Sequence, residues 1–206
     1  MSRAATILEF WFGRLDAAGL PDQRVERRWF NADDAFDAEV RARFEPDLRN
    51  AAAGRLTRWE RDPRSALALV ILFDQFPRNM YRGKPRAFLF DEHARAVAGR
   101  AVGRGLDARL QPIERVFLYM PFEHSEDAAD QTESVRLFRQ LADAVPEEQR
   151  ERFRGYLGYA LQHREVIDRF GRFPHRNEVL GRASTLQETA FLEEGASTWG
   201  QVRDTE

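Results

Sequence analysis

Histidine and acidic side chains concentrate in two stretches of the chain, and their types could bind a metal ion. Neutral imidazoles combined with carboxylates suit zinc, iron or manganese. The candidates are His124, His163 and His175 with Glu123 and Glu126. However, the chain has no His-Glu-x-x-His motif, and it lacks the two Glu-x-x-His pairs of helical di-iron proteins. We therefore predict no metal ligands and no cofactor.

Acid–base catalysis is an alternative role for the same groups. Asp74 or Glu123 could act with His124 or His163 as the acid and the base. The sequence contains no Gly-rich phosphate loop and no Gly-x-Ser-x-Gly turn, so it does not support nucleophilic serine chemistry. Whether the protein is an enzyme stays open, and these four residues are only candidates for a catalytic role.

Arginines near these stretches favour a binding function instead. A guanidinium group matches the geometry of a carboxylate or a phosphate, so several of them on neighbouring loops would hold an anion. We predict that the protein binds an anionic small molecule or peptide in a pocket lined by arginine, histidine and asparagine. The predicted binding residues are Arg78, Asn79, Arg82, His124, His163, Arg164, Arg172, His175, Arg176 and Asn177.

Internal pairing is the alternative interpretation of these arginines. Five carboxylates lie in the same stretches and could neutralise them: Asp74, Glu123, Glu126, Glu165 and Asp168. Lys84 is the only lysine of the chain, so arginine is the default basic residue and a cluster of arginines is weaker support for a site. In this interpretation His163 is a hydrogen-bonded core residue, and Asn79 and Asn177 are turn or helix-cap residues.

The element that must position His163 is a helix with one apolar stripe. The stripe follows steps of four, three, four and three residues through Tyr156, Ala160, His163, Ile167 and Phe170. This spacing places the histidine on the buried face of the helix. Gly171 and Pro174 then end the helix, and Phe173 must be extended because it precedes a proline. Residues 175–177 are thereby held on a loop near the helix end.

Two other helix ends are expected to meet this loop. An apolar helix that begins at Pro63 is predicted to end at residues 74–79, where a proline is followed by arginine and asparagine. A second helix begins at Pro112 and is predicted to be interrupted at Pro121, before the charged residues 123–126. The predicted pocket lies among these three proline-broken ends.

Helical spacing also accounts for the remaining apolar residues, and no stretch alternates with a period of two. The other predicted helices are one that ends at Gly13, one bent or two separate helices over 35–59 because of Pro46, and helices over 85–103, 125–143 and 185–193. Ser125 and Thr185 are the predicted caps of the last two. The aromatic pair Trp29-Phe30 is predicted to lie in the core. The predicted fold class is all-α.

Length, composition and net charge limit the class of protein. With 206 residues, 43% of them hydrophobic, we predict a single domain over 1–206 with a loose tail from about 195. A net charge of −2 argues against nucleic acid as a partner. The chain has no cysteine, Glu9 interrupts any signal-peptide core, and the longest apolar run, 66–73, is far shorter than the roughly 18 residues of a membrane helix. We predict a cytoplasmic protein with no membrane contact.

Four motifs occur in order along the chain: residues 7–13 (ILEFWFG), 74–79 (DQFPRN), 117–126 (FLYMPFEHSE) and 170–177 (FGRFPHRN). Together they resemble the bacterial Domain of Unknown Function 924 family. The resemblance implies antiparallel helical hairpins similar to tetratricopeptide repeats, although the chain itself has no period of about 34 residues. It implies no activity. A self-associating structural module is a further alternative, since the chain has 16 phenylalanines.

Overall fold

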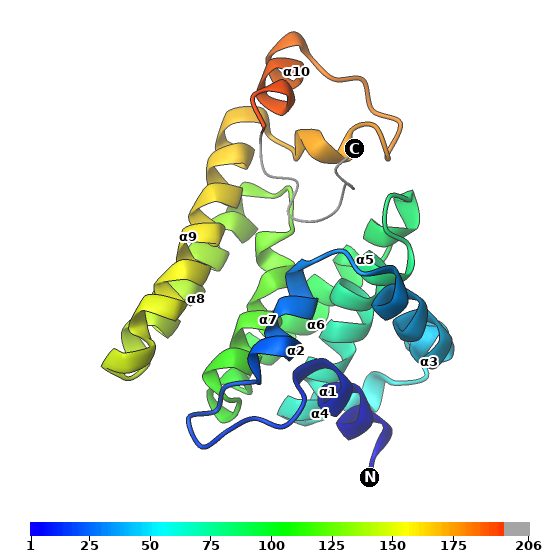
Figure 1. The fold of residues 1–206 in the computed structure, drawn as a ribbon, viewed down its shortest axis with the longest axis vertical. Helices are drawn as coiled ribbons and strands as arrows, with labels where there is room; N and C mark the ends of the chain where they lie inside the picture. The colour runs from blue at the N-terminus through cyan, green and yellow to red at the C-terminus, as the bar shows by residue number, and fades with distance from the viewer. Residues whose placement is uncertain (196–206) are drawn as a thin grey trace.

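Helices form throughout residues 1–195, the part of the chain that the computed structural model describes (Figure 1). No β-strand occurs in this part, which confirms the predicted all-α class. No helix within it is both long enough and apolar enough to cross a membrane. The predicted loose tail lies almost entirely in 196–206, outside the described residues.

The N-terminal third of the chain forms α1 (Arg3–Phe12), α2 (Gln23–Phe30) and α3 (Asp34–Ala52). Each begins at a residue whose side-chain oxygen accepts a backbone N–H of the first turn: Ser2, Asp22 and Asp33. Pro46 lies inside α3 without breaking it, so the predicted alternative of two helices is wrong. α3 ends before the left-handed Gly54, and a 3₁₀ turn, η1 (Thr57–Arg61), follows.

The apolar segment that starts at Pro63 continues further than predicted. α4 (Pro63–Val70), the π-helical turn η2 (Ile71–Gln75) and α5 (Phe76–Met80) follow one another directly. Residues 74–79 are therefore helical, and the predicted helix end there is wrong. Pro77 lacks an N–H and crowds the carbonyl four residues earlier, which the wider π turn before it accommodates.

The middle of the chain adds the turn η3 (Pro85–Phe88), α6 (Asp91–Gly103), the turn η4 (Asp107–Arg109) and α7 (Pro112–Glu123). Pro121 lies within α7, so the predicted interruption is wrong: the helix continues to Glu123. The next helix, α8 (Ala128–Ala144), is capped by Asp127 and not by Ser125 as predicted. The side chain of Ser125 instead accepts the backbone N–H of Asp127.

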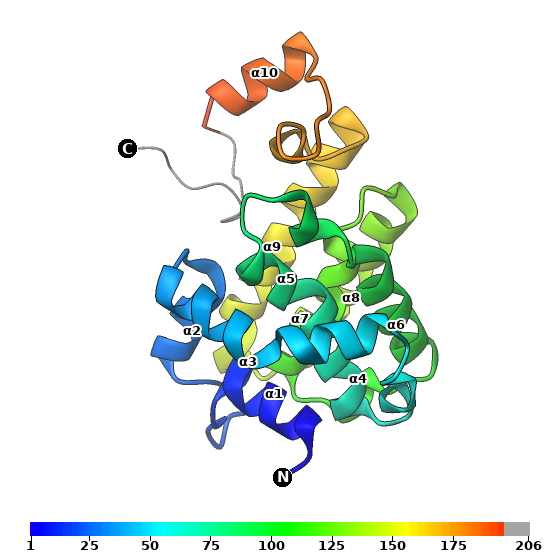
Figure 2. The same ribbon diagram turned by 90° about the vertical axis from the view of Figure 1, so that its right-hand side faces the viewer.

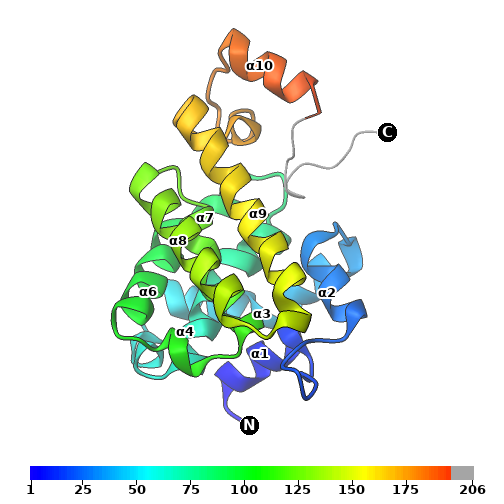
Figure 3. The ribbon, with the colours of Figure 1, turned by 90° about the vertical axis from the view of Figure 1, so that its left-hand side faces the viewer.

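The long helix that was predicted to carry His163 is α9 (Glu147–Phe170), which ends at left-handed Gly171 as expected. It lies alongside α8 (Figures 1 and 3). Phe173 is extended, the turn η5 (Pro174–Arg176) follows, and α10 (Leu186–Glu193) lies at the end of the molecule opposite the N-terminus (Figure 2). The predicted capping box of α10 is present, between Thr185 and Glu188.

An aromatic cluster joins α1, α2 and α7 in the core. The ring centroid of Phe117 lies 5.5 Å from that of Trp11, 5.3 Å from Phe12 and 4.5 Å from Trp29. Trp29 is buried as predicted, but Phe30 is 52% exposed. The prediction that both aromatics lie in the core is therefore wrong for Phe30, which is the last residue of α2.

Replacement of the central ring should be severely destabilising. Phe117→Ala removes a fully buried side chain and leaves a cavity among three other aromatic rings, so we expect a loss of about 3 to 5 kcal/mol in unfolding free energy. Leu161→Ala, at a 42% exposed position of α9, is the control and should change it by less than about 1 kcal/mol. Urea denaturation followed by circular dichroism measures both. Equal small losses would contradict this account of the core.

Candidate functional site

Polar residues from three of the four motifs meet where η2 and α5, the end of α7, α9 and η5 come together. Asp74 contributes a carboxylate from η2, and α7 ends with Glu123 and His124 side by side in sequence. His163 comes from the buried face of α9, as the apolar stripe predicted. The sites named from separate parts of the sequence are thus one cluster.

Asp74 is the centre of this cluster and has no exposed surface. Its carboxylate accepts hydrogen bonds from Nδ1 of His124, at 2.7 Å, and from the side-chain amide of Gln75. Its Oδ1 also lies 3.2 Å from Nη1 of Arg78. Burial by itself would raise the pKa of Asp74, but the charge of Arg78 and the contact with His124 lower the pKa to about 2. The carboxylate is therefore ionised at neutral pH.

Two imidazoles beside it are held in a defined tautomer. Nδ1 of His124 faces the ionised carboxylate of Asp74, and Nδ1 of His163 lies 2.8 Å from the carbonyl oxygen of Tyr159. Both oxygens can only accept, so each Nδ1 carries the proton and each Nε2 carries the lone pair. Burial lowers the pKa of His124, and burial together with His124 lowers the pKa of His163 to about 3. Both rings are neutral at pH 7.

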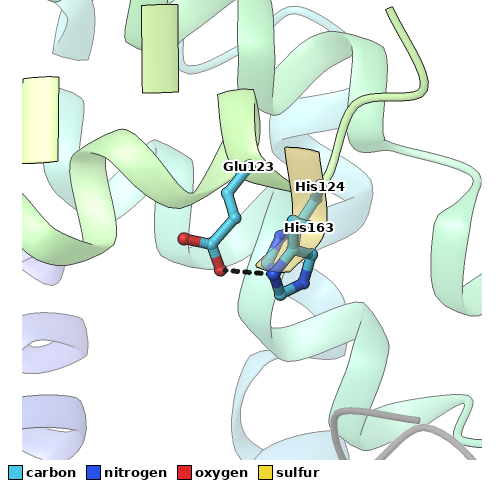
Figure 4. Close-up of side chains that lie close together, drawn as sticks. All are labelled: Glu123, His124 and His163. Carbon is cyan, nitrogen blue, oxygen red and sulfur yellow. Dashed lines mark ion pairs between the residues drawn. The ribbon is translucent and has the colours of Figure 1, made fainter. Parts of the chain in front are cut away.

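Glu123 lies against these rings (Figure 4). Its Oε1 is 3.5 Å from Nδ1 of His163, and its side chain is buried. Burial, and then the charge of Asp74, raise the pKa of Glu123 to about 8. Among the described residues no group forms a hydrogen bond with this carboxyl. The group is therefore a protonated acid at pH 7 in the absence of a cation.

Arg78 and Arg82 are also part of the cluster, and each is paired with a carboxylate. Arg78 donates to both oxygens of Asp91, at 2.8 and 3.0 Å, in addition to its contact with Asp74. Arg82 donates to both oxygens of Asp37, at 2.8 and 3.1 Å. These contacts are the internal pairing that the sequence left open, although the partners Asp91 and Asp37 come from α6 and α3 and were not among the expected carboxylates.

The other predicted binding residues differ in position. Arg176 is buried, donates to the carbonyl oxygen of His124 at 3.0 Å and lies 3.7 Å from Asp91. Burial and nearby Arg78 lower the pKa of Arg176 to about 10. This arginine lines a second hollow of about 260 Å³, to which His124 also contributes. His175, next to it, is buried, and its pKa falls to about 2 because of burial and the charge of Arg176.

Four of the predicted residues serve local structure. Arg172 pairs with Glu188 of α10 at 2.6 Å, and Arg164 contacts Asp168 one turn further along the exposed face of α9. The Asn177 amide donates to Oγ of Ser184, 3.1 Å away. The Asn79 amide donates to Oδ1 of Asp37. Of these four residues, only Asn79 belongs to the wall of the cavity described next.

A cavity of about 230 Å³ opens beside the cluster. One wall is polar and is formed by Gln75, Arg78, Asn79, Arg82, Glu123, His124 and His163. The other wall is apolar and consists of Trp29, Phe30, Met120, Phe138, Tyr156 and Tyr159. A mainly aromatic lining combined with a few polar groups is typical of a small-molecule site.

Sequence reasoning missed both Gln75 and the aromatic wall. Gln75 follows Asp74 directly, but it was expected at a helix end and not inside a π turn that faces the cavity. Phe30 was assigned to the core, and Tyr159 lies outside the apolar stripe of α9. Tyr159 is exposed on the same helix that buries Tyr156. A large aromatic residue outside the apolar stripe was the signal that could have identified this part of the cavity lining.

The cluster is chemically capable of more than binding. His124 combines an orienting carboxylate with a lone pair on Nε2, and it lines the cavity, so it has the requirements of a general base or of a metal ligand. Glu123 is placed beside it as a proton donor. These contacts keep the enzyme alternative open without assigning a reaction.

Comparison with known proteins identifies the family. A family described as bacterial protein of unknown function (DUF924) matches residues 7–196. The chain belongs to this family. A solved structure, of a protein of unknown function from Agrobacterium tumefaciens, is similar, with a TM-score of 0.79 and 38% sequence identity over 93% of this chain and 97% of that one. No curated protein matches the chain. Membership of DUF924 therefore agrees with the resemblance seen in the motifs and supplies no activity.

The raised pKa of Glu123 gives a prediction for stability in buffer with a chelator. Between its ordinary pKa and about 8, the folded chain holds a proton on Glu123 that the unfolded chain has lost, so stability falls as the pH rises through this range. Glu123→Gln imitates the protonated acid. It should raise the unfolding free energy at pH 8 by on the order of 2 kcal/mol and flatten the profile between pH 4.5 and about 8.

The control for this measurement is Glu114→Gln. Glu114 is also buried, but Arg64 lies 2.6 Å away and the backbone N–H of Gln111 donates to it. Its replacement should therefore lower the unfolding free energy, whereas that of Glu123 raises it. Urea titrations of the three proteins across the pH range decide this, and superimposable profiles for wild type and Glu123→Gln would contradict the assignment of an unpaired buried acid.

Proposed function

We propose that the cavity binds a small organic anion, with the anionic group at the polar wall and an aromatic or other apolar body at the aromatic wall. One observation carries this proposal. The guanidinium groups of Arg78 and Arg82 line the cavity, but the carboxylates that pair with them among residues 1–195, Asp74, Asp91 and Asp37, do not. The cavity is thus lined by the positively charged member of each ion pair. A protonated Glu123 carries no negative charge that would neutralise it.

Two exposed aromatic side chains support the apolar half of the proposal. Phe30 and Tyr159 are each 52% exposed, and both line the cavity. Large apolar side chains scattered over a surface need no explanation, but two that lie beside one polar-walled cavity provide a contact for a ligand. The volume of about 230 Å³ favours a small molecule over a peptide.

The organisation of the chain is part of the same proposal. One apolar core contains buried residues from α1 through α9, which supports a single domain over 1–206. A cytoplasmic location, based on the absence of cysteine, and a stacking of helical hairpins similar to tetratricopeptide repeats remain proposals as well. Neither is needed for binding in the cavity.

Thermal denaturation with probe anions tests the function. Phenyl phosphate and benzoate each join a benzene ring to an anion, and benzyl alcohol is the uncharged counterpart. With a chelator present, we expect the two anions, at millimolar concentration, to raise the melting temperature by mass action and benzyl alcohol to leave it unchanged. A wild-type protein that no organic anion stabilises, or that benzyl alcohol stabilises equally, would contradict the proposal.

Matched variants locate the binding. Arg82→Gln should weaken phenyl phosphate binding about tenfold in calorimetry, whereas Arg172→Gln, which removes the pair with Glu188, lies away from the cavity and should not. Tyr159→Ala should weaken it several-fold, and Leu161→Ala, an exposed position on the same helix outside the cavity wall, should have no effect. Equal effects within either pair would place binding elsewhere.

A further inference from the structure

We propose that Glu123, His124 and His163 bind a divalent transition-metal ion at the polar wall of the cavity. Each residue offers one ligand atom, and the three atoms all lie within 4.8 Å of one another. Two of the residues are neighbours at the end of α7, and the third comes from α9 (Figure 4). The rigid packing of these helices therefore fixes the donor set. This proposal replaces the sequence-based expectation of no metal ligand.

The hydrogen bonds behind the histidines are those of metal-binding imidazoles. A histidine that binds a metal ion usually donates its other ring N–H to a carboxylate or a backbone carbonyl. His124 donates Nδ1–H to Asp74 at 2.7 Å, and His163 donates Nδ1–H to the carbonyl oxygen of Tyr159 at 2.8 Å. Asp74 is itself held by Gln75 and Arg78. Each ring is thus oriented by a second interaction, with the lone pair on the nitrogen that remains.

The carboxyl of Glu123 provides an independent reason. A buried polar group is nearly always hydrogen-bonded, and a group without a protein partner that lines a cavity has room for water or an ion. Glu123 is 5% exposed, Nδ1 of the neutral His163 ring lies 3.5 Å from its Oε1, and no hydrogen bond from a described residue to its carboxyl is present. A divalent cation would supply the missing partner.

The donor set indicates the class of ion. Two imidazole nitrogens and one carboxylate suit zinc, iron(II), cobalt(II) or manganese(II), whereas magnesium and calcium prefer oxygen alone. Three protein ligands also leave at least one coordination position open, as in sites that bind a substrate. All three residues line the cavity, so the open position faces it.

A bound ion would strengthen the proposed binding of an anion. Because Arg78 and Arg82 already share their charge with carboxylates, a cation among Glu123, His124 and His163 would be the strongest attraction for the anionic group of a ligand. This part of the inference rests on the proposed function. Binding of the ion itself does not, and it can be measured without any organic ligand.

The experiment uses tag-free protein treated with a chelator and then dialysed. Cobalt(II) is added while the visible absorption is recorded, and zinc(II) binding is measured by calorimetry. We expect one ion per chain, with ligand-field bands in the cobalt form. Glu123→Gln and His163→Gln should each weaken zinc binding by about 100-fold or more. His93→Gln should not, because His93 contacts Phe73 and Phe90 and lies outside the cluster. Circular dichroism checks that each variant is folded.

The outcomes separate this inference from the proposed function. Zinc binding that survives both Glu123→Gln and His163→Gln, or the absence of stoichiometric binding of both cobalt(II) and zinc(II), would overturn the metal site. Phenyl phosphate binding in chelator, lost in Arg82→Gln, would still support the cavity. Conversely, Arg82→Gln should bind zinc with the affinity of the wild type. If no organic anion binds, the zinc measurements still support the metal site.

Discussion

A buried negative charge organises the polar half of this structure. Asp74 has no exposed surface and yet is ionised, so positive and hydrogen-bonding groups must surround it. Arg78 from α5, His124 from the end of α7 and Gln75 from the same π turn do so. Removing any of them would leave a charge in the interior, which links the positions of three helices to one carboxylate.

The charged groups around Asp74 are compensated by further partners in the same way. Arg78 reaches Asp91 of α6, and Arg176 of η5 lies between Asp91 and the carbonyl oxygen of His124. In this way a network of ion pairs connects the segment after α9 to the centre of the molecule. The cavity lies at the border of this network, where its polar side meets the aromatic residues of α2 and α9. A site at such a border has fixed polar groups on one side and an apolar surface on the other.

Local patterns predicted most of the helices because each depends on neighbouring residues. The stripe that carries His163, the stop at Gly171 and the capping box of Thr185 all act within one or two turns. Apart from the cap of α8 and the exposure of Phe30, the errors occurred at prolines. Pro46, Pro77 and Pro121 all lie in helical segments, because packing on several sides outweighs the loss of one hydrogen bond.

The residue types of the site could be predicted from the sequence, but the ion pairs among them could not. Histidines and acids could be recognised by type, and the structure brings Asp74, Glu123, His124 and His163 together. Whether an arginine was paired could not be read from sequence, since the partners of Arg78 and Arg82 lie on other helices: Asp91 is 13 positions away and Asp37 is 45. Which side of each ion pair faces the cavity depends on the packing of whole helices.

We propose that the Glu123–His124–His163 cluster and the two arginines that line the cavity form one binding site. Anomalous diffraction at the zinc edge, from crystals grown with zinc and phenyl phosphate, tests it most directly. The account predicts one strong peak about 2 Å from a Glu123 oxygen and from a ring nitrogen of each histidine, with the phosphate between the ion and Arg82. An empty cavity, or zinc bound only at surface carboxylates, would contradict it.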